Sequence, residues 1–183
     1  MRVITVVITV GWVGFWLYWL SAAIGVKAGR TRWGRGVGVR VAIAVIVIVL
    51  LRFKAVRTAL APIRDPALAG IGLALFVLGL ALAVWARLHI GRNWGTPMSQ
   101  KVDPELVTDG PYRRIRHPIY SGIILAILGT ALAVSLFWLV AVALLGGYFI
   151  YSAVMEERYM TKLFPEQYPA YQRSTRMLIP FVF

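Results

Sequence analysis

Long apolar runs separated by short charged segments dominate the chain of 183 residues. Residues 3–26 and 67–86 carry no charge, and each run reaches the roughly 20 residues that a helix needs to cross the bilayer core. Residues 41–51 form a shorter uncharged run of eleven residues between Arg40 and Arg52. This run crosses only if both arginines extend toward the interfaces and flanking residues within 37–56 join the helix.

The longest uncharged stretch covers residues 118–155, which is 38 residues. As a single helix it would be about 57 Å long, against a hydrocarbon core of about 30 Å. The chain must therefore turn back near residues 133–137 and form a helical hairpin. The pattern predicts an all-α integral membrane protein with about five transmembrane helices, in which the fourth and fifth spans form the hairpin. The whole chain, residues 1–183, is one membrane domain with three spans in residues 1–90.

Charge returns after the hairpin, in residues 156–183. Phe164, Tyr168 and Tyr171 recur at helical spacing, so this C-terminal tail is predicted to be an amphipathic segment that lies against the bundle at the interface. Pro165 and Pro169 are expected to keep the tail from forming one regular helix.

The composition agrees with a membrane protein, because 60% of the residues are hydrophobic and the mean hydropathy is +0.74. The formal net charge of +13 does not indicate nucleic-acid binding, since the basic residues lie between apolar runs and not along one stripe. Fifteen Lys and Arg residues fall in the first loop, in residues 87–116 and in the tail, against five on the other side. The positive-inside rule then predicts an inner (cytoplasmic) membrane protein with its N-terminus outside and its C-terminus in the cytoplasm.

The first apolar run also resembles a signal peptide. It is longer than the roughly 7 to 15 residues of a signal-peptide core and leads directly into further spans, so it is predicted to be a retained span, with a signal anchor as the alternative. The chain has no cysteine, which excludes disulfides, thiolate zinc sites and a cysteine nucleophile. Its two histidines lie 28 residues apart, which is a poor ligand set, so no metal site is predicted.

The motif GPYRRIRHPIYSG, residues 110–122, concentrates basic residues at the start of an apolar helix. Pro118 suits the first turn of a helix, which puts His117 at or near the helix cap. A helix N-terminus carries partial positive charge, and Arg113, Arg114 and Arg116 add full charges beside it. The motif therefore favours binding of a carboxylate or a phosphate.

Other residues of the same motif fit a ligand pocket. Gly122, one turn into the helix, leaves room for a ligand to approach the backbone, and Tyr120 offers a ring and a hydroxyl. The Gly-Pro pair at 110–111 breaks the chain and lets Tyr112 fold back over the pocket. The alternative is that the motif only holds the chain at the membrane interface, with Tyr120 in an aromatic belt. His89, at the end of the third span, is interpreted as such an interfacial residue.

Glu156 and Glu157 are the first acidic residues after the uncharged stretch and lie at the predicted cytoplasmic end of the last span. Acidic groups at that depth are costly unless they are paired or functional. Adjacent residues point in different directions on a helix, so at most one is expected to face a pocket, and we favour Glu157. If the acidic pair instead binds the arginines at 113–116, the two motifs still meet.

Together these stretches resemble the membrane methyltransferases typified by isoprenylcysteine carboxyl methyltransferase, with the related phospholipid methyltransferases. The resemblance lies in ELVTDGPYRRIRHPIYSGIILAILGTAL, residues 105–132, and EERYMTKLFPEQYPAYQRSTRMLIPFV, residues 156–182, with the apolar hairpin between them. It implies a small helical membrane enzyme that binds S-adenosylmethionine on the cytoplasmic side. It also implies that the methyl acceptor is a lipophilic or lipidated molecule taken from the bilayer. Residues 91–183 would then form the half of the chain that binds the cofactor and carries out catalysis.

The resemblance implies roles for individual residues. Those that match cofactor-binding positions are Leu106, Val107, Tyr112, His117, Pro118, Tyr120, Gly122, Tyr168 and Tyr171. Those that match the reaction centre are Glu157, Glu156 and Arg116. Many relatives have an arginine about one turn before the acidic pair, where this chain has Tyr151 and Ser152. This difference argues against a prenylcysteine carboxylate as the acceptor, because such a group needs a cationic partner.

Two other classes of function remain open. The first is an NADPH-dependent membrane reductase, because sterol reductases share a similar C-terminal pattern and basic residues also suit the 2′-phosphate of NADPH. The second is a non-enzymatic membrane interaction protein, which would need neither the acidic pair nor His117. The chain contains no P-loop, H-E-x-x-H, G-x-S-x-G or G-x-G-x-x-G motif, which excludes a soluble-type nucleotide-binding sheet. The reacting group of the acceptor, a carboxyl, an amine or a thiol, stays open at this point.

Overall fold

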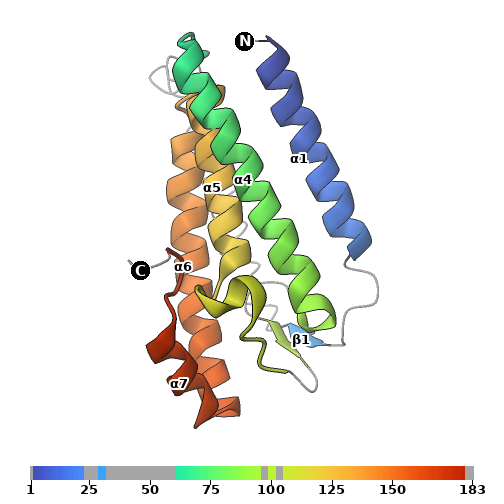
Figure 1. Cartoon of the computed structure of the whole chain (residues 1–183), viewed down its shortest axis with the longest axis vertical. Helices are drawn as coiled ribbons and strands as arrows, with labels where there is room; N and C mark the ends of the chain where they lie inside the picture. The colour runs from blue at the N-terminus through green and yellow to red at the C-terminus, as the bar shows by residue number, and fades with distance from the viewer. Residues whose placement is uncertain (1, 23–28, 32–60, 96–98, 102–104, 180–183) are drawn as a thin grey trace.

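In the computed structural model, the described residues are 2–22, 29–31, 61–95, 99–101 and 105–179. Among these residues, three helices are long and apolar enough to cross a membrane: α1 (Arg2–Ala22), α4 (Pro66–Ile90) and α6 (Trp138–Leu163). A shorter apolar helix, α5 (Pro118–Ala133), packs against both α4 and α6 (Figure 1). The helical membrane fold is confirmed, while the predicted span at residues 41–51 lies outside the described residues.

The helix ends follow from the local sequence. Asp65 caps α4, because its Oδ1 accepts a hydrogen bond from the backbone N–H of Ala67 at 2.8 Å. Pro118 is the first residue of α5, and His117 is the N-cap residue, as predicted. The chain turns between α5 and α6 within residues 134–137, which confirms the hairpin.

Glycines allow α4 and α5 to pack with their backbones in contact. Gly72 and Gly79 of α4 meet Gly129 and Gly122 of α5 in antiparallel order. A Cβ atom at Gly122 would lie 2.6 Å from the carbonyl oxygen of Gly79, which is too close for any side chain. Small residues at such contacts are typical of helix pairs in membranes. Gly122 therefore serves helix packing, and the expectation that it leaves room for a ligand is wrong.

Helix α1 packs against α4 and α5 and buries few of its side chains (Figure 1). Its buried residues are Ile8 and Phe15. Trp12 adds a hydrogen bond from its Nε1 to Oγ1 of Thr130 on α5 at 3.1 Å. The position of α1 therefore depends on a small number of contacts.

Arg87 ties the end of α1 to the end of α4. This buried side chain donates from Nη2 to the carbonyl oxygen of Ala22 and from Nη1 to that of Gly91 at 2.8 Å. Its guanidinium lies 4.6 Å from the ring centre of Trp94. The Trp94 ring meets Trp19 of α1 edge to face, with 5.7 Å between ring centres. Arg87 therefore positions the end of α1 together with two aromatic rings.

Replacing Arg87 by methionine is expected to loosen α1 and to lower the free energy of unfolding by about 1.5 to 3 kcal/mol, the range for hydrogen bonds to charged groups. Methionine fills much of the same volume, so the loss reports the guanidinium and not a cavity. The measurement is thermal unfolding in detergent, followed by tryptophan fluorescence. The exposed Arg92 supplies a matched control, R92M. Equal midpoints for the two variants would show that Arg87 does not hold α1.

Four short elements complete the fold near the end of the bundle at which α4 finishes (Figure 1). They are η1 (Gly91–Asn93), η2 (Gly110–Arg113), β1 (Gly29–Thr31) and β2 (Ser99–Lys101). Strands β1 and β2 pair antiparallel, and this pairing is an addition to the all-α prediction. The pairing needs two segments about 70 residues apart to meet, and neither of these three-residue strands shows the alternating pattern that predicts a strand. It joins the chain after α1 to the chain after α4 (Figure 1).

The C-terminal tail lies against the bundle, as predicted (Figure 1). Helix α7 (Gln167–Ser174) follows α6 after a break at residues 164–166, which contains Pro165. Pro169 does not interrupt α7, because it lies in the first turn, where its missing N–H has no partner to lose. Tyr168 is buried at 3% exposure and fixes α7 to the bundle.

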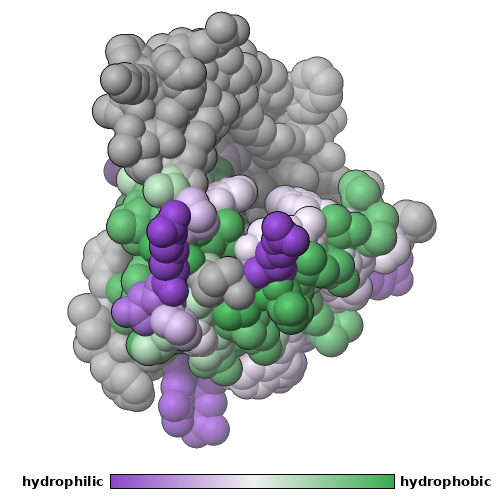
Figure 2. All heavy atoms as spheres, turned by 90° about the horizontal axis from the view of Figure 1, so that it is seen from above, coloured by the Kyte–Doolittle hydropathy of each residue, from purple (hydrophilic) through white to green (hydrophobic). Residues whose placement is uncertain are grey.

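The outward faces of the helices are apolar. Leu20 on α1 and Leu78 and Leu88 on α4 are 69%, 60% and 65% exposed. Figure 2 shows, from the end at which α1 and α4 begin, an apolar described surface interrupted by separate hydrophilic side chains. Exposed apolar surface of this kind is what a bilayer requires of a spanning helix bundle.

Candidate functional site

A cavity of about 540 Å³ lies where α4 ends and α5 begins. Small-molecule sites typically have volumes of roughly 300 to 1,000 Å³. Nine of the twelve predicted site residues line it: Leu106, Val107, Tyr112, Arg116, His117, Tyr120, Glu156, Tyr168 and Tyr171. The other three predicted residues, Pro118, Gly122 and Glu157, are not among its lining residues. The structure thus brings the two sequence motifs together at one cavity.

A tight turn places Tyr112 over the cavity. Gly110 has a φ of 54°, which favours glycine, and a Cβ atom there would lie 2.6 Å from Cε1 of His89. The backbone N–H of Tyr112 donates to the carbonyl oxygen of Asp109 at 3.0 Å. His89 Nε2 lies 2.9 Å from Oδ1 of Asp109, and this hydrogen bond lowers the pKa of the Asp109 carboxyl. His89 therefore supports the turn that carries Tyr112.

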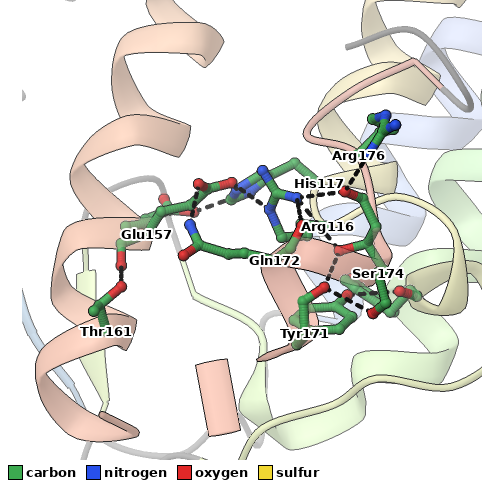
Figure 3. Close-up of polar contacts among 11 residues, drawn as sticks. Arg116, His117, Glu157, Thr161, Tyr171, Gln172, Ser174 and Arg176 are labelled. Carbon is green, nitrogen blue, oxygen red and sulfur yellow. Dashed lines mark hydrogen bonds and ion pairs between the residues drawn. The ribbon is translucent and has the colours of Figure 1, made fainter. Parts of the chain in front are cut away.

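Arg116 and Glu157 form a buried ion pair beside the cavity (Figure 3). Arg116 Nε donates to Glu157 Oε1 at 2.6 Å, and the two side chains are 10% and 9% exposed. Gln172 Nε2 donates to the other carboxylate oxygen at 2.7 Å. Both oxygens of Glu157 are thus engaged by protein groups, so the preference for Glu157 as the acid that faces the pocket is wrong. Pairing of the acids with the arginines, the alternative interpretation, is confirmed for this residue.

Arg116 also holds the C-terminal tail (Figure 3). Its Nη1 donates to the carbonyl oxygen of Thr175 at 2.9 Å. The backbone N–H groups of Arg116 and His117 donate to the carbonyl oxygens of Arg176 at 2.8 Å and Met177 at 3.1 Å. The ion pair with Glu157 therefore joins α6, the start of α5 and the end of the tail.

His117, Tyr120 and Glu156 form the polar centre of the cavity wall. The Tyr120 hydroxyl donates to Glu156 Oε1 at 2.6 Å. His117 lies between the two acids, with Nδ1 3.6 Å from Glu156 Oε2 and Nε2 3.3 Å from Glu157 Oε1. The rings of His117 and Tyr120 are parallel, with 5.4 Å between their centres. Glu156, whose side chain is 27% exposed, is the acid of the pair that lines the cavity.

Three tyrosines cover the cavity from the η2 turn and the tail. The Tyr171 hydroxyl donates to the carbonyl oxygen of Tyr112 at 2.6 Å. The rings of Tyr168 and Tyr171 meet edge to face, 5.9 Å apart. Burial raises the pKa of all three hydroxyls. The three side chains therefore stay neutral and offer aromatic surface and hydroxyl groups.

The arginines expected at the start of α5 do not form a common anion site. Arg113 and Arg114 are exposed and are not among the residues that line the cavity. Arg116, which does line the cavity, is engaged by Glu157 and the tail. Of the three arginines expected to bind a carboxylate or phosphate together, two are therefore absent from the residues that line the cavity.

The sequence did not single out several groups that line the cavity. Six of these are aromatic residues of the long helices and of the loop after α4: Trp16, Trp19, Trp94, Tyr148, Phe149 and Tyr159. Asn93 and Glu105 are the others with polar side chains, and Asn93 Nδ2 donates to Glu105 Oε2 at 3.0 Å. Oδ1 of Asn93 is buried and has no hydrogen-bond partner in the part of the chain that the structure describes. Asn93 and Trp94, followed by Gly95, are the sequence signal that could have pointed to this part of the cavity. The same residue types are equally typical of a membrane interface.

Comparisons with known proteins found several relatives of this chain. The chain is 35% identical over 111 residues to the cobalt-zinc-cadmium resistance protein CzcN of Cupriavidus metallidurans, covering 59% of this chain and 49% of that protein. It is 27% identical over 119 residues to protein-S-isoprenylcysteine O-methyltransferase B of Arabidopsis thaliana, covering 63% of this chain and 60% of that protein. It is 29% identical over 114 residues to protein-S-isoprenylcysteine O-methyltransferase of Schizosaccharomyces pombe, covering 60% and 48%. The chain thus spans 48% to 60% of the length of these relatives.

A solved structure and a family model were also matched. The structure of the eukaryotic intramembrane Ras methyltransferase ICMT aligns with a TM-score of 0.48 and 26% identity, covering 84% of this chain and 55% of that one. The model of the family described as phospholipid methyltransferase matches residues 68–167. The match runs from α4 to the start of α7 and takes in the acidic pair. Since it covers more than half of the 183 residues, the chain belongs to the phospholipid methyltransferase family.

Proposed function

We propose that this protein is an S-adenosylmethionine-dependent methyltransferase that acts on a lipophilic acceptor in the membrane. The observation that carries the proposal is a cavity, at one end of a membrane-helix bundle, in which the carboxylate of Glu156 lies among aromatic rings. Carboxylates attract a sulfonium cation, and aromatic faces favour it further. Family membership and the names of two relatives as methyltransferases support the proposal.

The groups on the cavity wall fit this cofactor. Glu156 lines the cavity, and Asn93 presents a buried amide oxygen that has no partner among the described residues. Glu105 offers a second carboxylate beside Asn93, suited to the hydroxyl groups of a ribose. When bound, S-adenosylmethionine supplies a methyl group activated on a positively charged sulfur.

The residues of the chain align the reactants and exclude water, which is the main task in an in-line methyl transfer. Tyr120 and His117 hold Glu156 in place on the cavity wall. The Arg116–Glu157 pair fixes the tail, so that Tyr168 and Tyr171 cover the cavity. In this view Glu156 contacts the reactants, while Arg116 and Glu157 are positioning residues.

The acceptor reaches the cavity from the bilayer in this proposal. Trp16 of α1 lines the cavity and is 52% exposed. In this proposal an apolar acceptor enters beside Trp16, from the lipid around α1. The segment 105–117 and the tail lie on the side that the distribution of Lys and Arg assigns to the cytoplasm, with the N-terminus outside. The cofactor would then enter from the cytoplasm and the acceptor from the inner membrane.

Calorimetric titration of the purified protein in detergent tests the cofactor. S-adenosylhomocysteine, the demethylated product, is expected to bind, and NADPH is not. Replacing His117 by alanine removes a ring from the cavity wall and one support of Glu156, so it should weaken binding by about tenfold, equivalent to roughly 1.4 kcal/mol. The exposed Arg158 gives the control variant R158A, which should bind normally. Binding of NADPH alone would favour the reductase alternative, and binding of neither would contradict an enzyme of either kind.

A further inference from the structure

Exposed arginines gather on two neighbouring segments outside the cavity. Arg173 and Arg176 lie in the tail, and Arg113 and Arg114 lie just before α5. Residues 110–122 and 167–179 contain no acidic residue. In the part of the chain that the structure describes, no acidic side chain forms an ion pair with Arg113, Arg173 or Arg176. The surface that these two segments form is therefore strongly cationic.

Backbone hydrogen bonds hold the two segments side by side. The N–H of Arg176 donates to the carbonyl oxygen of Arg114 at 3.0 Å, and the N–H of Arg116 donates to that of Arg176 at 2.8 Å. Ile115 and Arg176 form a parallel bridge. Figure 3 shows Arg176 on the opposite side of Arg116 from Glu157. Arg176 therefore lies beside the start of α5 but outside the buried ion pair.

The tail carries Arg176 to the level at which the charged end of the bundle meets its apolar part. Beyond Arg176 the tail follows the first turn of α5, since Ser121 Oγ donates to the carbonyl oxygen of Leu178 at 2.6 Å. Helix α5 carries no charge. Ile179, three residues after Arg176, is apolar and 54% exposed. An exposed arginine followed by an exposed apolar side chain suits the headgroup region and the acyl region of one leaflet, in that order.

We propose that Arg113, Arg173 and Arg176 bind the phosphate groups of anionic lipids in the leaflet at this end of the bundle. A lipid fits better than a soluble anion, because the exposed Ile179 needs an apolar environment beside the charges. The bound lipid also holds the tail against the bundle. Because the tail supplies Tyr168 and Tyr171 to the cavity wall, anionic lipid favours the covered cavity. This lipid surface is separate from the cavity and does not depend on the proposed methyltransferase function.

Opening of the tail is measured by chymotrypsin cleavage after Tyr168 or Tyr171, because cleavage follows the population of the open form. The full chain is placed in nanodiscs of phosphatidylcholine alone or mixed with phosphatidylglycerol. We expect phosphatidylglycerol to slow cleavage of the parent protein by about tenfold. In R173Q/R176Q this effect should fall to about threefold or less, since Arg113 alone remains. The effect is the ratio of rates in the two lipids for each variant, so a general loosening of the tail cancels.

The matched control is R2Q/R64Q, which removes two exposed arginines at the opposite end of the bundle. This variant should keep the tenfold effect, and high salt should abolish the effect in the parent protein by screening. An equal effect of phosphatidylglycerol in the parent and in R173Q/R176Q would overturn the proposal. Equal protection by inorganic phosphate or by a polyglutamate peptide, added to nanodiscs of phosphatidylcholine alone, would also overturn it, because the surface would then bind soluble anions. The assay contains no cofactor, so failure of the methyltransferase function would leave its result unchanged.

Discussion

Gly79→Leu is expected to lower the free energy of unfolding by about 3 kcal/mol or more, among the largest effects of any single change in the described helices. A Cβ atom at this position would lie 2.5 Å from the carbonyl oxygen of Gly122, which is a backbone atom that cannot rotate away. Helices α4 and α5 must therefore separate along their contact. Cofactor binding should be lost together with stability, because α5 carries His117 and Tyr120.

Gly70→Leu is the matched control for this prediction. Gly70 lies on the same helix, is exposed, and a Cβ atom there would meet nothing within 4 Å. Leucine has a better helix propensity than glycine by roughly 0.5 to 1 kcal/mol, so this variant should be as stable as the parent or slightly more stable. Thermal unfolding and gel filtration in detergent compare the two variants. Equal stability of Gly79→Leu and Gly70→Leu would contradict the close packing of α4 on α5.

The long helices were predictable because a bilayer imposes a simple rule on the sequence. A span needs about 20 apolar residues, and a stretch of twice that length must turn back. Residues 118–155 obey this rule, and the hairpin forms at the predicted place. The packing of the helices was not predictable in the same way, because a helix that is apolar on every side does not reveal which face meets its neighbour. Gly122 was misassigned for this reason, since close helix contact and ligand access both call for glycine.

The site was predictable as a meeting of two motifs, but not in its detail. Nine of the residues expected there do line one cavity. Which of two adjacent acids faces it depends on the rotation of α6, and a difference of one residue turns a side chain by about 100°. Glu157 binds Arg116 and Gln172 instead. The spacing of residues in the tail does not indicate Gln172 as a partner of Glu157. Contacts that depend on where a tail folds back have no local signal in the sequence.

Replacing Glu157 by leucine is expected to cost about 3 to 5 kcal/mol, the range for removing one partner of a buried ion pair. The change leaves the guanidinium of Arg116 buried at 10% exposure without its carboxylate. It also removes the acceptor for Gln172 on α7. We therefore expect a lower thermal midpoint, faster proteolysis of the tail and weaker binding of S-adenosylhomocysteine. The exposed Glu166 again gives the control, E166L, which should behave like the parent.

The double variant R116M/E157L separates a positioning role from a chemical one. Replacing both charges by apolar side chains leaves no unpaired buried charge, so the double variant should recover about half or more of the stability that Glu157→Leu loses. Recovery stays incomplete, because Arg116 also donates to the tail carbonyl of Thr175. If the pair only positions the tail, methyl transfer should recover in step with the thermal midpoint. If Glu157→Leu is as stable as the parent yet transfers no methyl group, Glu157 takes part in the reaction itself and the positioning role is wrong.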